Sequence, residues 1–203
     1  MSNDRDTIFA AIRAALAPLP NRADNPEWDD ELIVCKPAQA FDSLKAQFAD
    51  KLAFASSRYY DSLDALAVFL KEENSTFGYC DPALAKHFET LDGITFDTEY
   101  DDSKINEYTF GITKASAGIA ESGTIMLKDS DTSARLAALA PWIHIAALEE
   151  SDIIESIPEA IKRFGDDPSI VFATGPSKTA DVEGILIEGV HGPGIQIAFV
   201  LPE

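Results

Sequence analysis

Hydrophobic residues along this chain alternate between short runs typical of β-strands and spacings typical of helices. The elements expected between residues 37 and 98 are a helix at 37–51, a strand at 52–55, a helix at 62–71, a strand at 76–80, a helix at 82–91 and a strand at 94–98. Strands that alternate with helices of about ten residues imply a largely parallel sheet covered on both faces.

The second half of the chain continues this alternation. The apolar runs expected as strands are 108–113, 124–127, 142–148, 169–174, 185–190 and 195–201. We expect a short helix that contains Arg135 and begins at Ser133 as N-cap, and a further helix over 153–164 that Pro158 starts or interrupts. The sequence therefore predicts a single α/β domain over residues 37–203, with a mostly parallel sheet flanked by helices.

The first 36 residues are predicted to form an N-terminal helical arm. A helix is expected over residues 6–17, and its apolar residues share one face, namely Ile8, Phe9, Ile12 and Leu16. Three prolines between residues 18 and 26 then favour an exposed connection, because proline cannot continue a helix. The apolar face packs either on its own domain or on a partner subunit.

Composition is that of a globular protein, with 46% hydrophobic and 25% charged residues. The 35 acidic and 16 basic residues give a net charge of −19, which repels a phosphate backbone and excludes a general nucleic-acid-binding function. A small anionic ligand stays open, because oriented amides and local cations outweigh distant, screened charges. No apolar run approaches the ~18 residues of a membrane span, and no secretory signal opens the chain, so we expect a cytoplasmic protein.

Cysteine usage and motifs exclude several kinds of site. Cys35 and Cys80 lie far apart and form no CxxC pair, which leaves no zinc or iron–sulfur spacing, so we expect buried thiols, no metal site and no cofactor in this chain. The chain also lacks GxGxxG, Walker, GxSxG and HExxH motifs. Nicotinamide, nucleoside triphosphate, α/β-hydrolase and zincin functions therefore have no motif support.

Small residues fill the segment between two expected strands, from Ala115 to Gly123. Small side chains let the backbone approach a neighbour or a ligand closely. Glu121, Ser122 and Thr124 thus sit where a tight turn could present a carboxylate and two hydroxyls. A polar hairpin turn without a functional role is the alternative interpretation.

An apolar strand leads into Gly175, after which we expect a helix that begins near Ser177. A helix N-terminus behind a parallel strand offers free amides that bind anions at the edge of the sheet. In such a helix Ser177 and Asp181 share a face, as do Thr179 and Glu183. A simple helix cap would also account for Ser177.

Two histidines are candidates for chemistry. His144 alternates with Ile143 and Ile145 and so faces the opposite side of its strand, either as a hydrogen-bonded structural residue or toward a pocket. His191 stands among glycines at the end of a strand. It is a candidate acid/base or ligand donor at neutral pH, or an ordinary turn residue.

Four segments together resemble the lactate-utilisation (LUD) domain family. They are GIAESGT at 118–124, SARLAAL at 133–139, WIHIAAL at 142–148 and ATGPSKTADVEGILIEGVHGPGIQIAFV at 173–200. The short length, without cysteine-rich ferredoxin-like sequence, is similar to the protein C branch of this family.

The resemblance implies a fold related to ribose-5-phosphate isomerases, CoA transferases and 5-formyltetrahydrofolate cyclo-ligases, with a ligand cleft at the C-terminal edge of the strands. It also implies a role in a cytoplasmic system that oxidises L-lactate to pyruvate, alongside separate iron–sulfur subunits as partners. In CoA transferases of this superfamily, a glutamate near the position of Glu121 acts as a nucleophile.

Two functions follow as expectations. In one, the chain is a non-redox subunit or accessory protein of the lactate-oxidising system, with an anion-binding cleft. In the other, it is a stand-alone enzyme for a small carboxylate, acyl or phosphorylated substrate, with Glu121 as nucleophile or base and His191 as acid/base. The candidate ligand-binding residues are Ser122, Thr124, Arg135, Gly175, Ser177, Thr179, Asp181 and Glu183.

Overall fold

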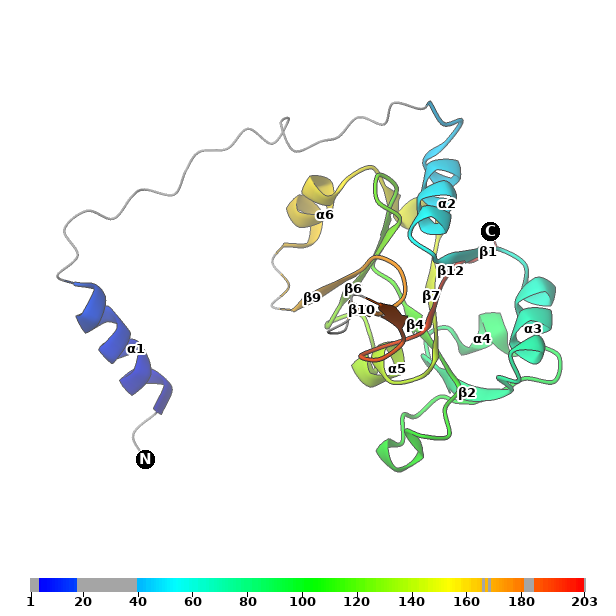
Figure 1. The fold of residues 1–203 in the computed structure, drawn as a ribbon, viewed down its shortest axis with the longest axis horizontal. Helices are drawn as coiled ribbons and strands as arrows, with labels where there is room; N and C mark the ends of the chain where they lie inside the picture. The colour runs from blue at the N-terminus through cyan, green and yellow to red at the C-terminus, as the bar shows by residue number, and fades with distance from the viewer. Residues whose placement is uncertain (1–3, 18–39, 166, 168, 181–184, 203) are drawn as a thin grey trace. The chain divides into compact units, whose positions relative to one another are not determined.

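Residues 4–17, 40–165, 167, 169–180 and 185–202 are described by a computed structural model (Figure 1). The chain divides into an N-terminal unit that contains helix α1 (Asp4–Leu16) and a second unit that contains the other described elements. Several expectations lie outside the described residues. These are the proline-containing connection, Cys35, the start of the helix expected at 37–51, Asp181 and Glu183.

The second unit is built around a six-stranded sheet in the order β1-β12-β7-β4-β2-β3, in which every neighbouring pair is parallel. Its strands are β1 (Arg58–Tyr60), β12 (Ile195–Val200), β7 (Ile143–Leu148), β4 (Phe110–Lys114), β2 (Phe77–Cys80) and β3 (Thr95–Asp97). All six residues of β7 are buried, as is typical of a parallel strand covered on both faces. The mostly parallel sheet predicted from the sequence is confirmed.

Helices α3 (Leu63–Glu72) and α4 (Ala85–Phe88) cover one face of this sheet (Figure 1). Leu70 from α3 and Phe88 from α4 belong to one apolar cluster with Phe199 of the central sheet. These side chains are fully buried, and their cluster is the largest of the apolar clusters in the described residues.

The opposite face is covered by helix α2 (Leu44–Phe54) and by a second sheet in the order β8-β5-β6-β9. The second sheet comprises β8 (Ile153–Ile154), β5 (Ala117–Ile119), β6 (Thr124–Lys128) and β9 (Ile170–Ala173). Phe48 from α2 packs with Ala146 and Ala198 of the central sheet. Helices α5 (Arg135–Leu139) and α6 (Ile157–Phe164) complete this side of the unit.

Two local predictions were wrong, and one strand was missed. Residues 52–55, expected as a strand, belong mainly to α2, because Leu52 continues the buried face begun by Phe48. Strand β1 then follows at 58–60 and was missed. Ser133 is not a helix cap, since Ala134 occupies that position and the Ser133 hydroxyl is hydrogen-bonded to Tyr79 Oη at 2.5 Å.

The helix expected over 153–164 is shorter than predicted. Ile153 and Ile154 form β8, and α6 begins after Ser156, whose side chain accepts the N–H of Glu159. Pro158 stands in the first turn of α6, where it lacks an N–H that would have no partner in any case, so its role as a helix start is confirmed.

The helix expected near Ser177 does not form. Strands β10 (Lys178–Ala180) and β11 (Leu186–Glu188) pair there as an antiparallel hairpin. The preceding strand β9 runs antiparallel to β6 in the second sheet, so it does not end at the C-terminal edge of the parallel sheet. The expected anion-binding helix terminus is therefore absent from the described residues.

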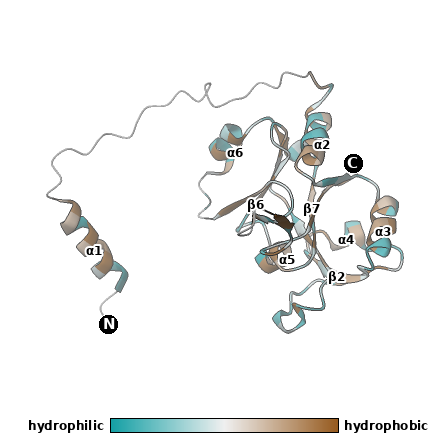
Figure 2. Ribbon diagram, in the orientation of Figure 1, coloured by the Kyte–Doolittle hydropathy of each residue, from teal (hydrophilic) through white to brown (hydrophobic). Residues whose placement is uncertain are grey.

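Helix α1 forms as predicted, and it has no buried residue. Ile8 and Ile12 are 59% and 46% exposed, and Figure 2 shows both hydrophobic and hydrophilic residues along this helix. Within the part of the chain that the structure describes, no helix combines the length and hydropathy needed to cross a bilayer.

Candidate functional site

The small-residue segment forms a tight turn between β5 and β6. The N–H of Gly123 donates to the carbonyl of Ile119 at 2.9 Å, and Gly123 has a φ of +67°, which favours glycine. A β-carbon on Gly123 would overlap the backbone of Lys51 and Leu52. The expectation that small residues allow a close backbone approach here is confirmed.

This turn presents the three predicted polar side chains, but each of them has a partner. Glu121 Oε1 accepts the N–H of Ile157 at 2.7 Å, at the first turn of α6. The hydroxyls of Ser122 and Thr124 lie 2.7 Å apart, and that of Thr124 lies 2.6 Å from the hydroxyl of Thr174. Glu121 thus links the turn to α6, and the hydroxyls of Ser122 and Thr124 link it to Thr174 after β9.

A cleft of about 500 Å³ opens beside this turn, between the end of α2 and the segment that follows β9. We call it the Lys51–Lys178 cleft; its lining residues are Lys51, Phe54, Ala55, Glu121, Ser122, Thr174 and Lys178. It brings together two of the predicted site residues, Glu121 and Ser122, with two lysines that sequence reasoning missed. Phe54, which is 89% exposed, adds an apolar side chain to this cleft.

The two lysines retain capacity to bind a ligand. Lys178 Nζ donates to Ser56 Oγ at 3.0 Å and lies 3.3 Å from Glu188 Oε1. Lys51 Nζ lies 3.5 Å from the carboxylate of its sequence neighbour Asp50. Both side chains are about one-third exposed, with relative exposures of 30% and 33%, so each ammonium group can still donate to an anion.

The predicted residues around Ser177 serve the hairpin. The N–H of Ser177 donates to the carbonyl of Pro193 at 2.9 Å, so this amide is not free for an anion. Thr179 pairs with Ile187 in the ladder between β10 and β11. Because β10 is a strand, the helical spacing expected to bring Ser177 beside Asp181 and Thr179 beside Glu183 does not arise.

Gly175 and His191 lie in the turns that bound this hairpin. Gly175 has a φ of +84°, and a β-carbon there would overlap the carbonyl of Ala55. His191 is exposed and does not line the Lys51–Lys178 cleft. The two residues predicted to be catalytic, Glu121 and His191, therefore do not share this cleft.

Arg135 is engaged elsewhere. Its Nε donates to Asp129 Oδ1 at 3.1 Å and its Nη2 donates to Ser169 Oγ at 2.9 Å. These contacts tie α5 to the segments that flank β6 and β9. Arg135 therefore does not line the Lys51–Lys178 cleft with Glu121 and Ser122.

His144 is a buried structural residue, as one of the two interpretations predicted. It is 1% exposed, and its Nδ1 and Nε2 lie 3.0 Å from Gln196 Oε1 and 2.8 Å from Thr113 Oγ1. Burial lowers the pKa of His144 to about 4, so the ring is neutral at physiological pH. Burial likewise raises the pKa of the Cys80 thiol to about 12, which makes it an unreactive core residue.

A second pocket lies at the C-terminal edge of the parallel sheet, where sequence reasoning had placed none of these groups. We call this hollow of about 310 Å³ the carboxyl-edge pocket; its lining residues are Ala83, Leu84, His87, Lys114, Ala115, Ala147, Leu148, Glu149, Asp152 and Leu201. The sequence did contain an indication of this pocket. Lys114 is the last residue of the apolar strand β4, and Glu149 directly follows the apolar strand β7.

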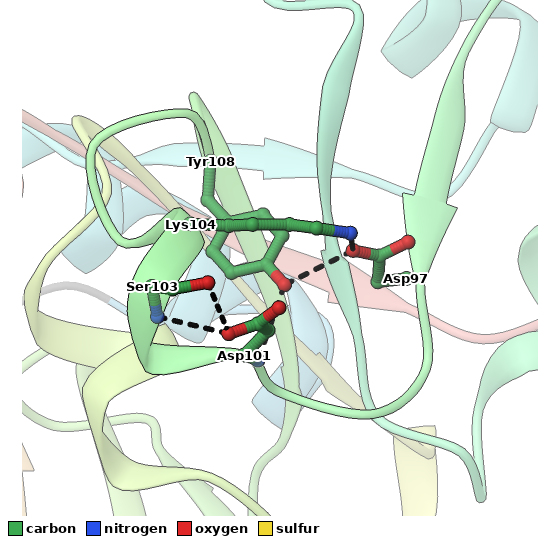
Figure 3. A network of polar contacts seen from close by, with 5 residues as sticks. All are labelled: Asp97, Asp101, Ser103, Lys104 and Tyr108. Atoms are coloured by element: carbon green, nitrogen blue, oxygen red, sulfur yellow. Dashed lines mark hydrogen bonds and ion pairs between the residues drawn. The ribbon is translucent and has the colours of Figure 1, made fainter.

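Another polar group of side chains fixes the loop between β3 and β4 (Figure 3). Asp97 accepts from Lys104 Nζ at 2.8 Å and from Tyr108 Oη at 3.1 Å, and Ser103 donates to Asp101. The hydrogen bond from Lys104 lowers the pKa of Asp97. Since these groups satisfy one another, we interpret this network as structural.

Metal-ion ligands are not grouped in the residues that the structure describes. No three or more histidine, cysteine, aspartate or glutamate side chains are gathered there as a bound metal would require.

Replacing Glu121 with alanine is expected to lower the free energy of unfolding by about 1 kcal/mol, because the Ile157 amide loses its acceptor at the start of α6. Urea denaturation followed by circular dichroism measures this change. Glu121→Gln keeps an oxygen acceptor and is expected to lose less. Equal losses in the two variants, or no loss in either, would contradict the capping role.

Several known proteins are similar in sequence to this chain over about half of its length. Lactate utilization protein C of Oceanobacillus iheyensis is 34% identical over 99 residues, which cover 45% of this chain and 42% of that protein. Lactate utilization protein C of Bacillus subtilis is 34% identical over 106 residues, covering 48% and 44%. An uncharacterised protein of Neisseria meningitidis serogroup B is 31% identical over 122 residues, covering 56% and 52%. The chain spans about half the length of the curated relatives it matches.

Among solved structures, a DUF162 family protein from Deinococcus radiodurans has the same fold. The TM-score is 0.56 at 20% identity, and the match covers 78% of this chain and 96% of that one. The LUD domain family model matches residues 31–201, which include the whole of the α/β unit from α2 to β12. The chain therefore belongs to the LUD domain family.

Proposed function

We propose that this chain is a non-redox component of an L-lactate utilisation system that oxidises lactate to pyruvate, and that the Lys51–Lys178 cleft binds a small carboxylate. The observation that carries the ligand class is the pairing of two partly exposed lysines with the hydroxyl of Ser122 at one cleft. The relatives named lactate utilization protein C support the biological setting.

A carboxylate suits this cleft electrostatically. Ammonium and hydroxyl groups donate charge-assisted hydrogen bonds to a carboxylate, and these are stronger than hydrogen bonds between neutral groups. The net charge of −19 opposes an anion at long range. Charges beyond about 8 Å are largely screened at physiological ionic strength, so the local field is set by Lys51 and Lys178 together with the carboxylates of Glu121, Asp50 and Glu188 beside them.

In this proposal, partner subunits carry out the oxidation of lactate. Lactate oxidation to pyruvate removes two electrons and two protons, which need an acceptor. The two cysteines of this sequence have no iron–sulfur spacing, so we assign the clusters to iron–sulfur partner subunits. This chain would bind and present the carboxylate.

A stand-alone enzyme is the alternative function. It needs the Glu121 carboxylate free to attack or to take a proton, with an acid/base within about 3 Å of the reacting group. Glu121 lines the cleft, with its Oε1 accepting the Ile157 amide, but His191 lies outside it, so the two residues predicted to be catalytic are not brought together there. Carboxylate binding is thus the function that the geometry supports best.

Calorimetric titration with L-lactate and pyruvate tests the cleft. Lys51→Ala and Lys178→Ala are each expected to weaken carboxylate binding by about tenfold, which corresponds to one lost charge-assisted hydrogen bond. Lys162→Ala is the matched control, because Lys162 is an exposed lysine of α6 that does not line the cleft. Absence of binding to the wild type, or equal affinity in all three variants, would contradict the proposal.

A further inference from the structure

The carboxyl-edge pocket lies at the C-terminal ends of the neighbouring parallel strands β2 and β4, after which the chain passes to opposite faces of the sheet. After β2 the chain continues into α4, on the face that carries α3. After the adjacent strand β4 it continues into β5 and β6 of the second sheet, on the opposite face. Such a divergence leaves a crevice at the C-terminal ends of the strands, which is where open α/β sheets bind ligands.

The walls of this pocket carry both signs of charge. Lys114 ends β4 with an exposed side chain, and among the described residues no carboxylate lies within ion-pair distance of its ammonium group. Glu149 precedes the short 3-10 helix η3 (Glu150–Asp152) after β7, and Asp152 is the last residue of that helix. His87 of α4 lines the pocket from the other side.

The two carboxylates are held in position but keep free acceptor capacity. Glu149 Oε2 accepts the Ser151 hydroxyl at 3.4 Å, and Asp152 Oδ2 accepts the N–H of Glu149 at 3.4 Å. Each ionised carboxylate has about four acceptor sites, so each can still accept from an ammonium group. Glu150, in contrast, is paired with Lys45 at 2.9 Å.

This charge pattern selects a ligand class. A simple carboxylate would gain Lys114 but would face Glu149 and Asp152, whose like charges oppose it. A ligand with an ammonium group beside its carboxylate would satisfy both walls at once. The apolar floor of Ala147 and Leu148 suits a small aliphatic group.

We infer that the carboxyl-edge pocket binds a small α-amino acid in its zwitterionic form, with the carboxylate on Lys114 and the ammonium group on Glu149 and Asp152. This site is separate from the Lys51–Lys178 cleft, and no residue lines both. The inference therefore stands independently of the proposed function.

L-Alanine and L-lactate form a matched pair of probes, because they differ only in an ammonium group against a hydroxyl at the α-carbon. We expect L-alanine, titrated into the ¹⁵N-labelled full chain, to shift the amide resonances of Lys114, Ala115 and Glu149. L-Lactate at the same concentrations should leave these three resonances unchanged. Any shifts that lactate causes near Lys51 and Lys178 report on the other cleft, so the two proposals can fail separately.

Two variants and one control complete the test. Lys114→Ala and Glu149→Gln are each expected to weaken L-alanine binding by about tenfold, since each removes one charged partner. Lys86→Ala, in α4 but outside the lining, should change it by less than about twofold, as is typical of an exposed charge. The inference is overturned if L-alanine shifts none of the three resonances, if lactate shifts them equally, or if the Lys114 and Lys86 variants bind alike.

Discussion

Replacing His144 with leucine is expected to lower the free energy of unfolding by about 2 to 5 kcal/mol at neutral pH, because two buried polar groups lose their partner. Gln196 Oε1 can only accept, so His144 Nδ1 carries the proton and Nε2 accepts from the Thr113 hydroxyl. Leucine fills a similar volume but leaves that hydroxyl and the amide oxygen unpaired in the centre of the sheet.

His144 also predicts how stability depends on pH. Its pKa is about 4 in the folded chain and 6.5 without burial, so the unfolded chain binds a proton between these values while the folded chain does not. The contribution is complete above pH 6.5 and is lost as the pH falls toward 4. Between about pH 7.5 and pH 5 this one residue should reduce the free energy of unfolding by about 2 kcal/mol.

Urea denaturation of both proteins at these two pH values checks the prediction. The His144→Leu chain should lose less stability on acidification than the wild type, because it lacks this titrating group. His87→Leu is the control, since His87 is exposed in α4 and its replacement removes a histidine without breaking a buried hydrogen bond. An identical pH dependence in wild type and His144→Leu would show that His144 is not held neutral by burial.

Replacing Gly111 with alanine is expected to destabilise the chain by about 3 kcal/mol or more, because a β-carbon would overlap the carbonyl oxygen of Ala137. Gly111 lies in the central strand β4 and Ala137 is fully buried in α5, so neither backbone can move without disturbing the core. Thermal unfolding and the urea midpoint measure the loss.

Gly192→Ala is the matched control for this prediction. A β-carbon at Gly192 would meet only the side chain of Ser177, at 3.3 Å, so we expect a change of less than about 1 kcal/mol. Similar stabilities for the Gly111 and Gly192 variants would contradict the close packing of α5 on β4.

Much of the central sheet could be predicted from the sequence. The apolar runs predicted at 142–148 and 195–201 contain the strands β7 and β12, whose residues are almost all buried, and such continuous apolar runs are typical of strands covered on both faces. The strand predicted at 52–55 was wrong because a run of four apolar residues fits the end of a helix as well as it fits a strand. Strand β1 was missed because Arg58–Tyr60 has no apolar run and pairs only with β12.

The candidate site was predicted less well, because its geometry depends on long-range pairing. The turn with Glu121 and Ser122 was recognised from its small residues, and it does line a cleft. The helix expected at Ser177 is replaced by a hairpin, since Ser177 bonds to Pro193 and β10 pairs with β11, contacts that no local pattern reveals. Lys51 and Lys178 reach the cleft from segments far apart in the sequence.

Anaerobic oxidation of L-lactate to pyruvate, in extracts of native cells lacking this chain, tests the central claim most directly. We expect oxidation to be lost, to return when purified wild-type chain is added, and to return only weakly with a chain that carries both Lys51→Ala and Lys178→Ala. Lactate oxidation that continues undiminished without the chain would contradict its assignment to lactate utilisation.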